Sequence, residues 1–181
     1  IEIIKEECFK RINDNIVEQE EKEKLSEDIA IVALKYADLL PYRATDYIFD
    51  PTKFSDLDGK TGPYLIYSTI RIKSLLKKAK ENNIEFSNFT KISSKTDKEI
   101  ILTILNLSSV LSRSYESKSL NEIADYLYKL TSLYNKFYSE NKIISENDKE
   151  KRESWLVLSK VVYDVNMLLL DLLGLKCPEK M

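Results

Sequence analysis

Histidine is absent from this 181-residue sequence, and glycine, proline and cysteine are scarce, with 3 Gly, 4 Pro and 2 Cys. Without histidine there is no Ser–His or Cys–His nucleophile pair, no histidine-ligated metal site and no histidine-containing nucleotide-binding signature. The two cysteines, Cys8 and Cys177, lack the CxxC spacing, which argues against both a disulfide framework and a zinc site. A reducing compartment such as the cytoplasm fits this usage best.

Long apolar runs are also missing. No stretch reaches the roughly 18 apolar residues that a membrane span requires, and no charged-then-apolar signal peptide opens the sequence. The chain begins with Ile1 rather than Met, which indicates a fragment or a processed product. We therefore expect a cytoplasmic protein that does not enter a membrane.

What is present favours helices. Charged residues make up 32% of the chain and hydrophobic residues 43%, a mixture that with so little Gly and Pro is typical of a helical domain. The predicted fold is an all-α bundle of about six helices. The expected helices are a stripe from Ile3 through Ile4, Cys8 and Ile12 to Ile16, a helix from Ser26 to about Leu40, and helices at about 64–80, 97–114, 120–139 and from Ser145 or Asn147 to a C′ glycine at Gly174.

Three of these helices carry start signals. Ser26 is a candidate N-cap, and Thr96 with Glu99 and Ser119 with Glu122 have the spacing of capping boxes. Residues 41–63 form the longest irregular stretch, and a loop of this length within a compact domain is usually functional.

Charge is unevenly distributed along the chain. Residues 1–27 contain nine acidic and five basic residues, a net charge of −4; the whole chain carries −2, which leaves +2 for the remainder. Residues 71–80 hold one arginine and four lysines and no acid. Since local patches govern attraction to phosphate, the acidic balance of the whole chain does not exclude RNA binding.

The segment Gly59–Arg71 is the most informative part of the sequence. Gly59, Gly62 and Pro63 predict a turn followed by a helix start. That helix places Tyr64, Tyr67 and Arg71 on one face, together with Ser68, Ser74 and Lys78. Two rings and a guanidinium beside a loop can stack on bases and pair with phosphate, although tyrosines half-buried at a helix interface would give the same pattern.

Gly59-Lys60-Thr61 also suggests a phosphate-binding loop. That motif needs another glycine five residues before Gly59, where this chain has Phe54, and it follows a hydrophobic strand that the sequence lacks. The motif is therefore incomplete.

Five segments of the chain, in order, resemble the C-terminal part of class I arginyl-tRNA synthetases, which carries the all-helical anticodon-binding domain named for its DALR motif. The resembling segments are ALKYADL at 33–39, DYIFD at 46–50, GKTGPYLIYSTIR at 59–71, YLYKL at 126–130 with Phe137-Tyr138, and PEKM at 178–181.

The resemblance implies a parent enzyme that forms arginyl-adenylate from arginine and ATP with Mg²⁺ and then esterifies arginine tRNA. It implies that residues 1–27 are a helical exit from a catalytic domain absent from this sequence, and that residues 28–181 are the DALR domain. The chain alone would then bind the anticodon stem-loop of arginine tRNA as a monomer, without catalytic residues, bound cofactor or metal.

The resemblance also assigns roles to individual positions. The loop of Asp56, Leu57, Asp58, Gly59, Lys60 and Thr61 would rearrange around the anticodon, and Tyr64, Tyr67, Arg71 and Lys78 would contact its bases and backbone. Tyr138 and the terminal Met181 would lie near the anticodon loop. Lys60 replaces the family's usual Asn, and Ile66 its Gln, which leaves base discrimination open.

Two alternatives remain. The chain could be a helical protein-interaction scaffold whose tyrosine-rich faces bind another helix, or the helical anticodon domain of a different class I synthetase.

Overall fold

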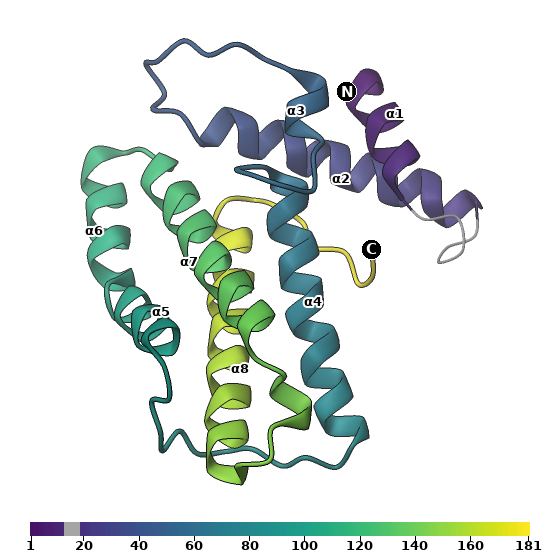
Figure 1. The fold of residues 1–181 in the computed structure, drawn as a ribbon. Helices are drawn as coiled ribbons and strands as arrows, with labels where there is room; N and C mark the ends of the chain where they lie inside the picture. The colour runs from purple at the N-terminus through teal and green to yellow at the C-terminus, as the bar shows by residue number, and fades with distance from the viewer. Residues whose placement is uncertain (13–18) are drawn as a thin grey trace.

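The computed structural model describes residues 1–12 and 19–181 and is all-helical over these ranges (Figure 1). The described elements are α1 (Glu2–Arg11), α2 (Gln19–Leu39), α3 (Pro51–Phe54), α4 (Gly62–Glu81), α5 (Lys95–Leu105), α6 (Leu107–Ser117), α7 (Asn121–Glu140), the 3₁₀ turn η1 (Ile143–Ser145) and α8 (Lys149–Leu172). The predicted all-α fold is confirmed, with more helices than expected. Ile16, the last member of the expected first stripe, lies outside the described residues.

The long helices α4, α7 and α8 pack against one another and form the centre of the bundle. In Figure 1, α5 and α6 lie beside α7 on one side, and α1 and α2 cross the upper end next to α4. The expected stripe of α7 is buried throughout, with Leu127, Leu130, Tyr134 and Phe137 inaccessible to solvent. The core is therefore continuous from α2 through α7 to α8.

Several polar groups inside the core form hydrogen bonds between helices. The Asn166 side-chain amide donates to the hydroxyls of Thr69 and Thr131, at 3.2 and 3.3 Å, and so links α8 to α4 and α7. The Tyr36 hydroxyl donates to the Ala124 carbonyl at 3.1 Å. Such bonds fix the relative positions of the helices because a buried polar group without a partner is costly.

Several helix starts differ from the expected ones. Ser26 is not a cap: α2 begins at Gln19, and the buried Ser26 hydroxyl donates to the Glu23 carbonyl within the helix. The Glu/Lys-rich run before Ser26 consists of good helix formers, which extends the helix toward the N-terminus. The N-cap of α8 is Asp148, whose side chain accepts from Lys151 N, rather than Ser145 or Asn147.

Neither predicted capping box forms. The Thr96 hydroxyl donates to Glu140 on α7 at 3.0 Å and does not cap a helix. The capping box of α5 is formed by Ser94 and Asp97. The N-cap of α7 is Leu120, without a side-chain bond, and the Ser119 hydroxyl donates to Asn121. The single helix expected over 97–114 is divided at Asn106 into α5 and α6.

The end of α8 matches the expected glycine stop. Gly174 has φ +63°, and the amides of Gly174 and Leu175 donate to the carbonyls of Asp171 and Leu170, at 2.9 and 2.8 Å. This is a Schellman motif, which turns the chain out of the helix.

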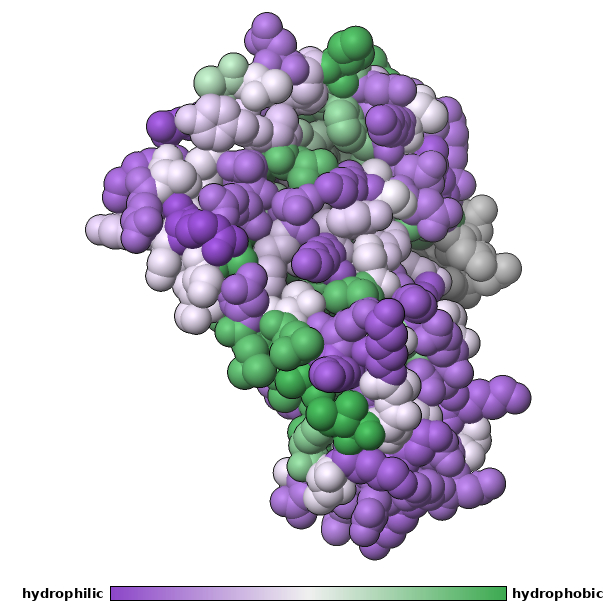
Figure 2. Space-filling view, turned by 60° about the vertical axis from the view of Figure 1, so that its left-hand side comes forward, coloured by the Kyte–Doolittle hydropathy of each residue, from purple (hydrophilic) through white to green (hydrophobic). Residues whose placement is uncertain are grey.

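One face of the bundle is unusually apolar. Figure 2 shows hydrophobic residues gathered on the side of α5 and α8. A shallow hollow there is lined by apolar side chains alone, namely Phe89, Ile101, Ile104, Leu105, Val157, Leu158 and Val161. Among the helices of the described ranges, none is long and apolar enough to span a membrane.

Candidate RNA-binding surface

The loop before α4, residues 55–61, is closed by its own polar groups. The Thr61 side chain caps α4 by accepting from Tyr64 N at 3.2 Å, and its hydroxyl donates back to the Asp56 carbonyl at 2.5 Å. Gly59 adopts φ +80° at the exposed end of the loop, a backbone conformation that glycine tolerates. The loop is thus a compact turn leading into α4.

Gly62 sets how closely α4 approaches α2. A Cβ atom on Gly62 would lie 2.6 Å from the Val32 carbonyl oxygen, a contact that folded proteins do not accommodate without movement. The GP pair at 62–63 therefore allows close helix packing as well as starting the helix.

Lys60 ties the loop to α7. Its ammonium group lies 2.5 Å from the Asp125 carboxylate and 5.3 Å from the centre of the Tyr128 ring. The Tyr64 ring packs against the same Tyr128 ring, with centroids 5.7 Å apart. The side chains of Lys60 and Asp125 are each about half exposed, so their ion pair positions the loop and adds little stability.

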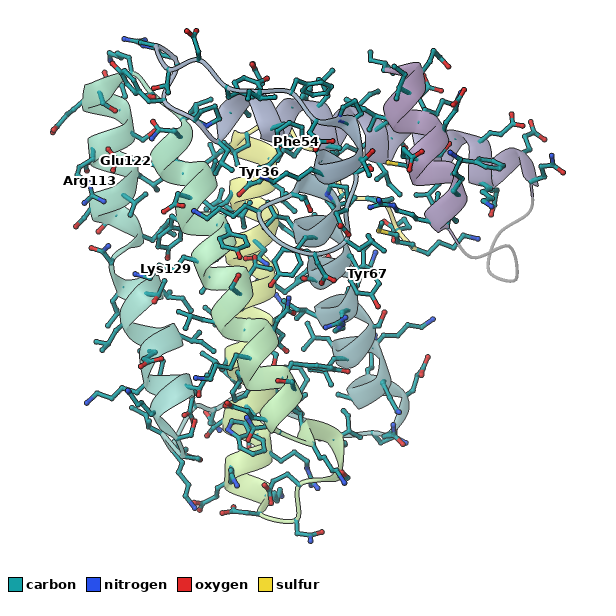
Figure 3. The ribbon with its side chains drawn as sticks, turned by 45° about the horizontal axis from the view of Figure 1, so that its top comes forward. Tyr36, Phe54, Tyr67, Arg113, Glu122 and Lys129 are labelled. Carbon is teal, nitrogen blue, oxygen red and sulfur yellow. The ribbon has the colours of Figure 1, made fainter. Side chains whose placement is uncertain are left out.

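Tyr64 and Tyr67 lie in different surroundings, although the sequence places them on one face of the helix. The Tyr64 hydroxyl is within 3.3 Å of the Ser132 hydroxyl and accepts from the Asn135 side chain at 2.8 Å, so Tyr64 belongs to the α4–α7 interface. Tyr67 is 37% exposed and projects from α4 on the side away from α5 and α6 (Figure 3). Ile66, at the position where the family has Gln, is completely buried and cannot reach a bound base.

Arg71 is held by two aromatic rings. Its guanidinium carbon lies 4.7 Å from the Tyr67 ring centroid and 5.6 Å from that of Tyr138. No described residue provides a hydrogen-bond acceptor or a carboxylate for its N–H groups. Cation–π contacts fix the guanidinium plane and leave its five donors available to an anion.

A pocket of about 210 Å³ opens beside Tyr67. Its walls come from α1, α2, the 55–61 loop, the start of α4 and the C-terminus, namely Cys8, Arg11, Ile12, Ile29, Ser55, Leu57, Pro63, Tyr67 and Met181. Arg11 is the charged group of the wall, and its Nη1 lies 3.4 Å from Asp56 Oδ1. The pocket is therefore a mainly apolar hollow with the Tyr67 ring and the Arg11 guanidinium at its border.

The C-terminal segment, residues 173–181, is held in place by four contacts with α2 and α4. Lys35 donates to the Gly174 carbonyl at 2.9 Å, Lys176 pairs with Asp28 at 2.9 Å, Lys180 pairs with Glu21 at 2.8 Å, and Lys73 on α4 pairs with Glu179. These contacts bring Met181 to the pocket, more than a hundred residues away in sequence from Tyr67.

Neither cysteine is a reactive nucleophile. Burial raises the pKa of the Cys8 thiol to about 11, and burial likewise raises the pKa of the Cys177 thiol to about 11. Both thiols are therefore protonated at neutral pH, and the thiolate is the nucleophilic form. Among the described residues no group of three His, Cys, Asp or Glu side chains could hold a metal ion.

The expected site residues divide into three groups. Leu57, Tyr67 and Met181 line the pocket, with Asp56 paired to its Arg11. Arg71, Lys78 and Tyr138 line a second hollow at the other end of the same surface. Lys60, Thr61 and Tyr64 build the loop and its contact with α7, while Asp58 and Gly59 are exposed at the loop tip.

Sequence reasoning missed the pocket residues of α1 and α2 and the cation Lys142 of the second hollow. Cys8 belongs to the stripe predicted for the first helix, Ile29 to the helix predicted from Ser26 to about Leu40, and neither they nor Arg11 were assigned a binding role, while Lys142 follows α7 without any motif. The basic block at 71–80 and the roles that the resemblance assigns to Arg71, Lys78 and Tyr138 both pointed toward the second hollow.

Comparison with known proteins places the chain in a family. Residues 65–181 match the model of the DALR anticodon binding domain. The chain is 34% identical over 183 residues to an arginine–tRNA ligase of Alkaliphilus oremlandii, covering 100% of this chain and 31% of that protein. It is 30% identical to that of Agathobacter rectalis, covering 98% of this chain and 32% of the relative. The chain thus spans about a third of the length of these curated relatives.

Solved structures agree with the sequence matches. The arginyl-tRNA synthetase of Plasmodium falciparum superposes with a TM-score of 0.78 at 26% identity, over 98% of this chain and 33% of that one. The Thermus thermophilus arginyl-tRNA synthetase has the same fold, with a TM-score of 0.83 at 20% identity over 99% of this chain and 32% of the other. The chain belongs to the DALR anticodon binding domain family and corresponds to that domain of arginine–tRNA ligases.

Proposed function

We propose that this chain binds the anticodon loop of arginine tRNA. The observation that carries the proposal is the juxtaposition of a pocket of about 210 Å³, bordered by Tyr67 and closed by Met181, with the ring-stacked Arg71 guanidinium. Proteins that recognise RNA sequence take single-stranded, unstacked bases onto aromatic rings and into pockets. One extruded base would enter the pocket, and its backbone would meet Arg71.

In a longer protein, the domain would serve an ATP-dependent arginine–tRNA ligase. ATP, Mg²⁺ and arginine would bind parts of that enzyme outside this chain, because the described residues form no metal site and the glycine pattern of a phosphate loop is incomplete at Phe54. We also propose that the protein is monomeric and cytoplasmic. We further propose that residues 1–27 are the helical exit from the catalytic domain and that residues 28–181 are the DALR domain, with the boundary within α2.

The test is a binding titration of the chain with arginine tRNA and with the same tRNA changed only at its anticodon. We expect tighter binding of the unchanged tRNA, and Arg71→Ala should weaken that binding while leaving the urea unfolding curve in place. Equal affinity of the wild type and Arg71→Ala for arginine tRNA would refute the proposal. No discrimination between anticodons would favour the domain of another synthetase.

The interaction-scaffold alternative is supported by the apolar face over α5 and α8, where Leu105 is 71% exposed. A salt titration separates it from RNA binding, because phosphate contacts make affinity fall steeply with added salt and apolar pairing does not. Leu105→Glu provides the matched variant: it should leave RNA affinity unchanged if our proposal holds.

A further inference from the structure

A second hollow extends the surface beyond Arg71. It has a volume of about 420 Å³ and lies between the C-terminal half of α4 and the turn that follows α7. Its lining consists of Arg71, Ser74, Leu75 and Lys78 from α4, Tyr138 and Ser139 from α7, and Asn141, Lys142, Ile143, Ile144 and Ser145 from the turn. We call it the α4–α7 groove.

The groove is positively charged. Its lining contains Arg71, Lys78 and Lys142 and no carboxylate. Within the described part of the chain, none of these three cations has an ion-pair partner. By contrast, two neighbouring lysines on the same helices lie near carboxylates, since Lys77 is 3.8 Å from Glu81 and Lys136 is 4.0 Å from Glu140.

The α4–α7 groove and the pocket beside Tyr67 meet at one stacked pair of side chains, Tyr67 and Arg71. Tyr67 borders the pocket, and Arg71, 4.7 Å from the Tyr67 ring, borders the groove. The Tyr138 ring, whose centroid is 5.6 Å from the Arg71 guanidinium carbon, also lines the groove. The pocket and the groove therefore adjoin at Tyr67 and Arg71.

The length of the groove suits a strand of RNA. Arg71 and Lys78 are seven residues apart on α4, a rise of about 10 Å, and both project into the same hollow. In double-stranded DNA, successive phosphates of one strand are about 3.4 Å apart along the axis, so a separation of about 10 Å exceeds one phosphate step. A groove of this length with cations along it can neutralise more than one phosphate.

We propose that the α4–α7 groove seats the sugar–phosphate backbone of the RNA strand next to the base held in the pocket, with Lys78 and Lys142 as its phosphate contacts. This inference rests on the proposed function and assigns a distinct task to each half of the surface. The pocket reads a base, and the groove contacts the backbone and carries no sequence information. Lys142, on the turn after α7, has no role in the sequence motifs.

The test uses the whole 181-residue chain and a hairpin with the arginine anticodon, with dissociation constants measured between 50 and 200 mM salt. Each phosphate contact contributes about 0.7–0.9 to the slope of log affinity against log salt. Lys78→Ala and Lys142→Ala should each weaken binding. In each variant, the loss of affinity between 50 and 200 mM salt should be about threefold smaller than in the wild type. The control is Lys98→Ala, an exposed lysine of α5 outside the groove, which should change neither.

A second hairpin with a changed anticodon makes the outcome specific. Lys142→Ala should weaken both hairpins by the same factor, since a backbone contact is independent of base identity. Lys142→Ala with the salt slope of the wild type, or with an effect on only one hairpin, would overturn the groove assignment. Failure of the proposed function shows separately, as equal binding of both hairpins by the wild type.

Discussion

Tyr64 and Tyr67 show how two identical residues one helical turn apart acquire different roles. The hydroxyl of Tyr64 bonds to Ser132 and Asn135 across the α4–α7 interface, whereas the Tyr67 ring is exposed beside the pocket and stacks on Arg71. The first tyrosine positions α4, and the second is available to a ligand.

This difference predicts opposite effects of matched substitutions. Tyr64→Phe should lower the free energy of unfolding by about 0.5–1.5 kcal/mol, because it removes a hydroxyl that two side chains engage. Tyr67→Phe should leave it unchanged. Urea unfolding of both variants measures this, and equal stabilities would contradict the assignment of Tyr64 to the interface.

Removing the ring of Tyr67 should affect RNA binding. Tyr67→Ala should weaken binding of the arginine anticodon hairpin by about 1–3 kcal/mol, the usual contribution of a base stacked on an aromatic ring, with the fold retained in circular dichroism. Tyr67→Phe, which keeps the ring, is the control and should bind nearly as the wild type. Full RNA affinity of Tyr67→Ala would show that the Tyr67 ring does not contact the RNA.

Gly62 gives a further prediction at the residue scale. Gly62→Ala should destabilise the fold by about 1–3 kcal/mol, as overpacking does, because the new Cβ meets the Val32 carbonyl of α2 at 2.6 Å. Gly59→Ala is the comparison: nothing lies within 4 Å of its Cβ, and the cost comes only from φ +80°. Thermal melting should rank Gly62→Ala below Gly59→Ala.

At the scale of elements, the start of α5 links helix capping to pH. Burial alone would raise the pKa of Asp97, but hydrogen bonds from the Ser94 side chain and from the backbone amides of Ser93 and Ser94 outweigh it and lower the pKa. A carboxylate with a lowered pKa in the folded state stabilises that state above its unfolded pKa of about 3.9 and loses this contribution as pH falls.

Asp97→Asn should therefore cost about 1 kcal/mol of stability at pH 7, the usual value of a capping interaction. The difference from wild type should shrink as the pH falls from about 4 through the lowered folded-state pKa of Asp97, because the unfolded carboxyl binds a proton first and the folded carboxyl loses its charge only below that. Urea unfolding at pH 7 and pH 3 measures this. Glu116→Gln, at an exposed carboxylate on α6, is the control, and a deficit for Asp97→Asn that is independent of pH would contradict the charged cap.

At the scale of the whole molecule, the C-terminal segment completes a site that begins in α1. Its ion pairs with α2 and α4 are exposed, and exposed pairs contribute about 0–1 kcal/mol each. The segment therefore contributes more to the shape of the pocket than to the stability of the bundle, because Met181 is one of the pocket walls.

Deletion of residues 178–181 should separate these contributions. We expect a melting temperature within a few degrees of wild type, since a change of 1 kcal/mol shifts a domain of 150–250 residues by about 2–4 °C. RNA affinity should fall because the pocket loses one wall. Lys180→Gln, which removes one ion pair and keeps Met181, should bind RNA nearly as the wild type. Full affinity after the deletion would show that the pocket does not need its C-terminal wall.

The sequence by itself determined the all-α class, the buried stripe of α7, the glycine stop at Gly174 and the turn followed by a helix start in the Gly59–Arg71 segment. These features depend on local chemistry, namely helical periodicity, caps and turn residues. The absence of histidine likewise excluded Ser–His and Cys–His nucleophile pairs and histidine-ligated metal sites.

Only the tertiary structure decided which of these residues are buried and which line a pocket. Tyr64 and Ile66 are turned into the bundle by α7 and its neighbours, while Arg11 and Met181, from the two ends of the chain, meet at one pocket. The capping box expected at Thr96 failed for the same reason, because its hydroxyl donates to Glu140 of α7. Burial and pairing arise from contacts between segments distant in sequence, and local patterns do not encode those contacts.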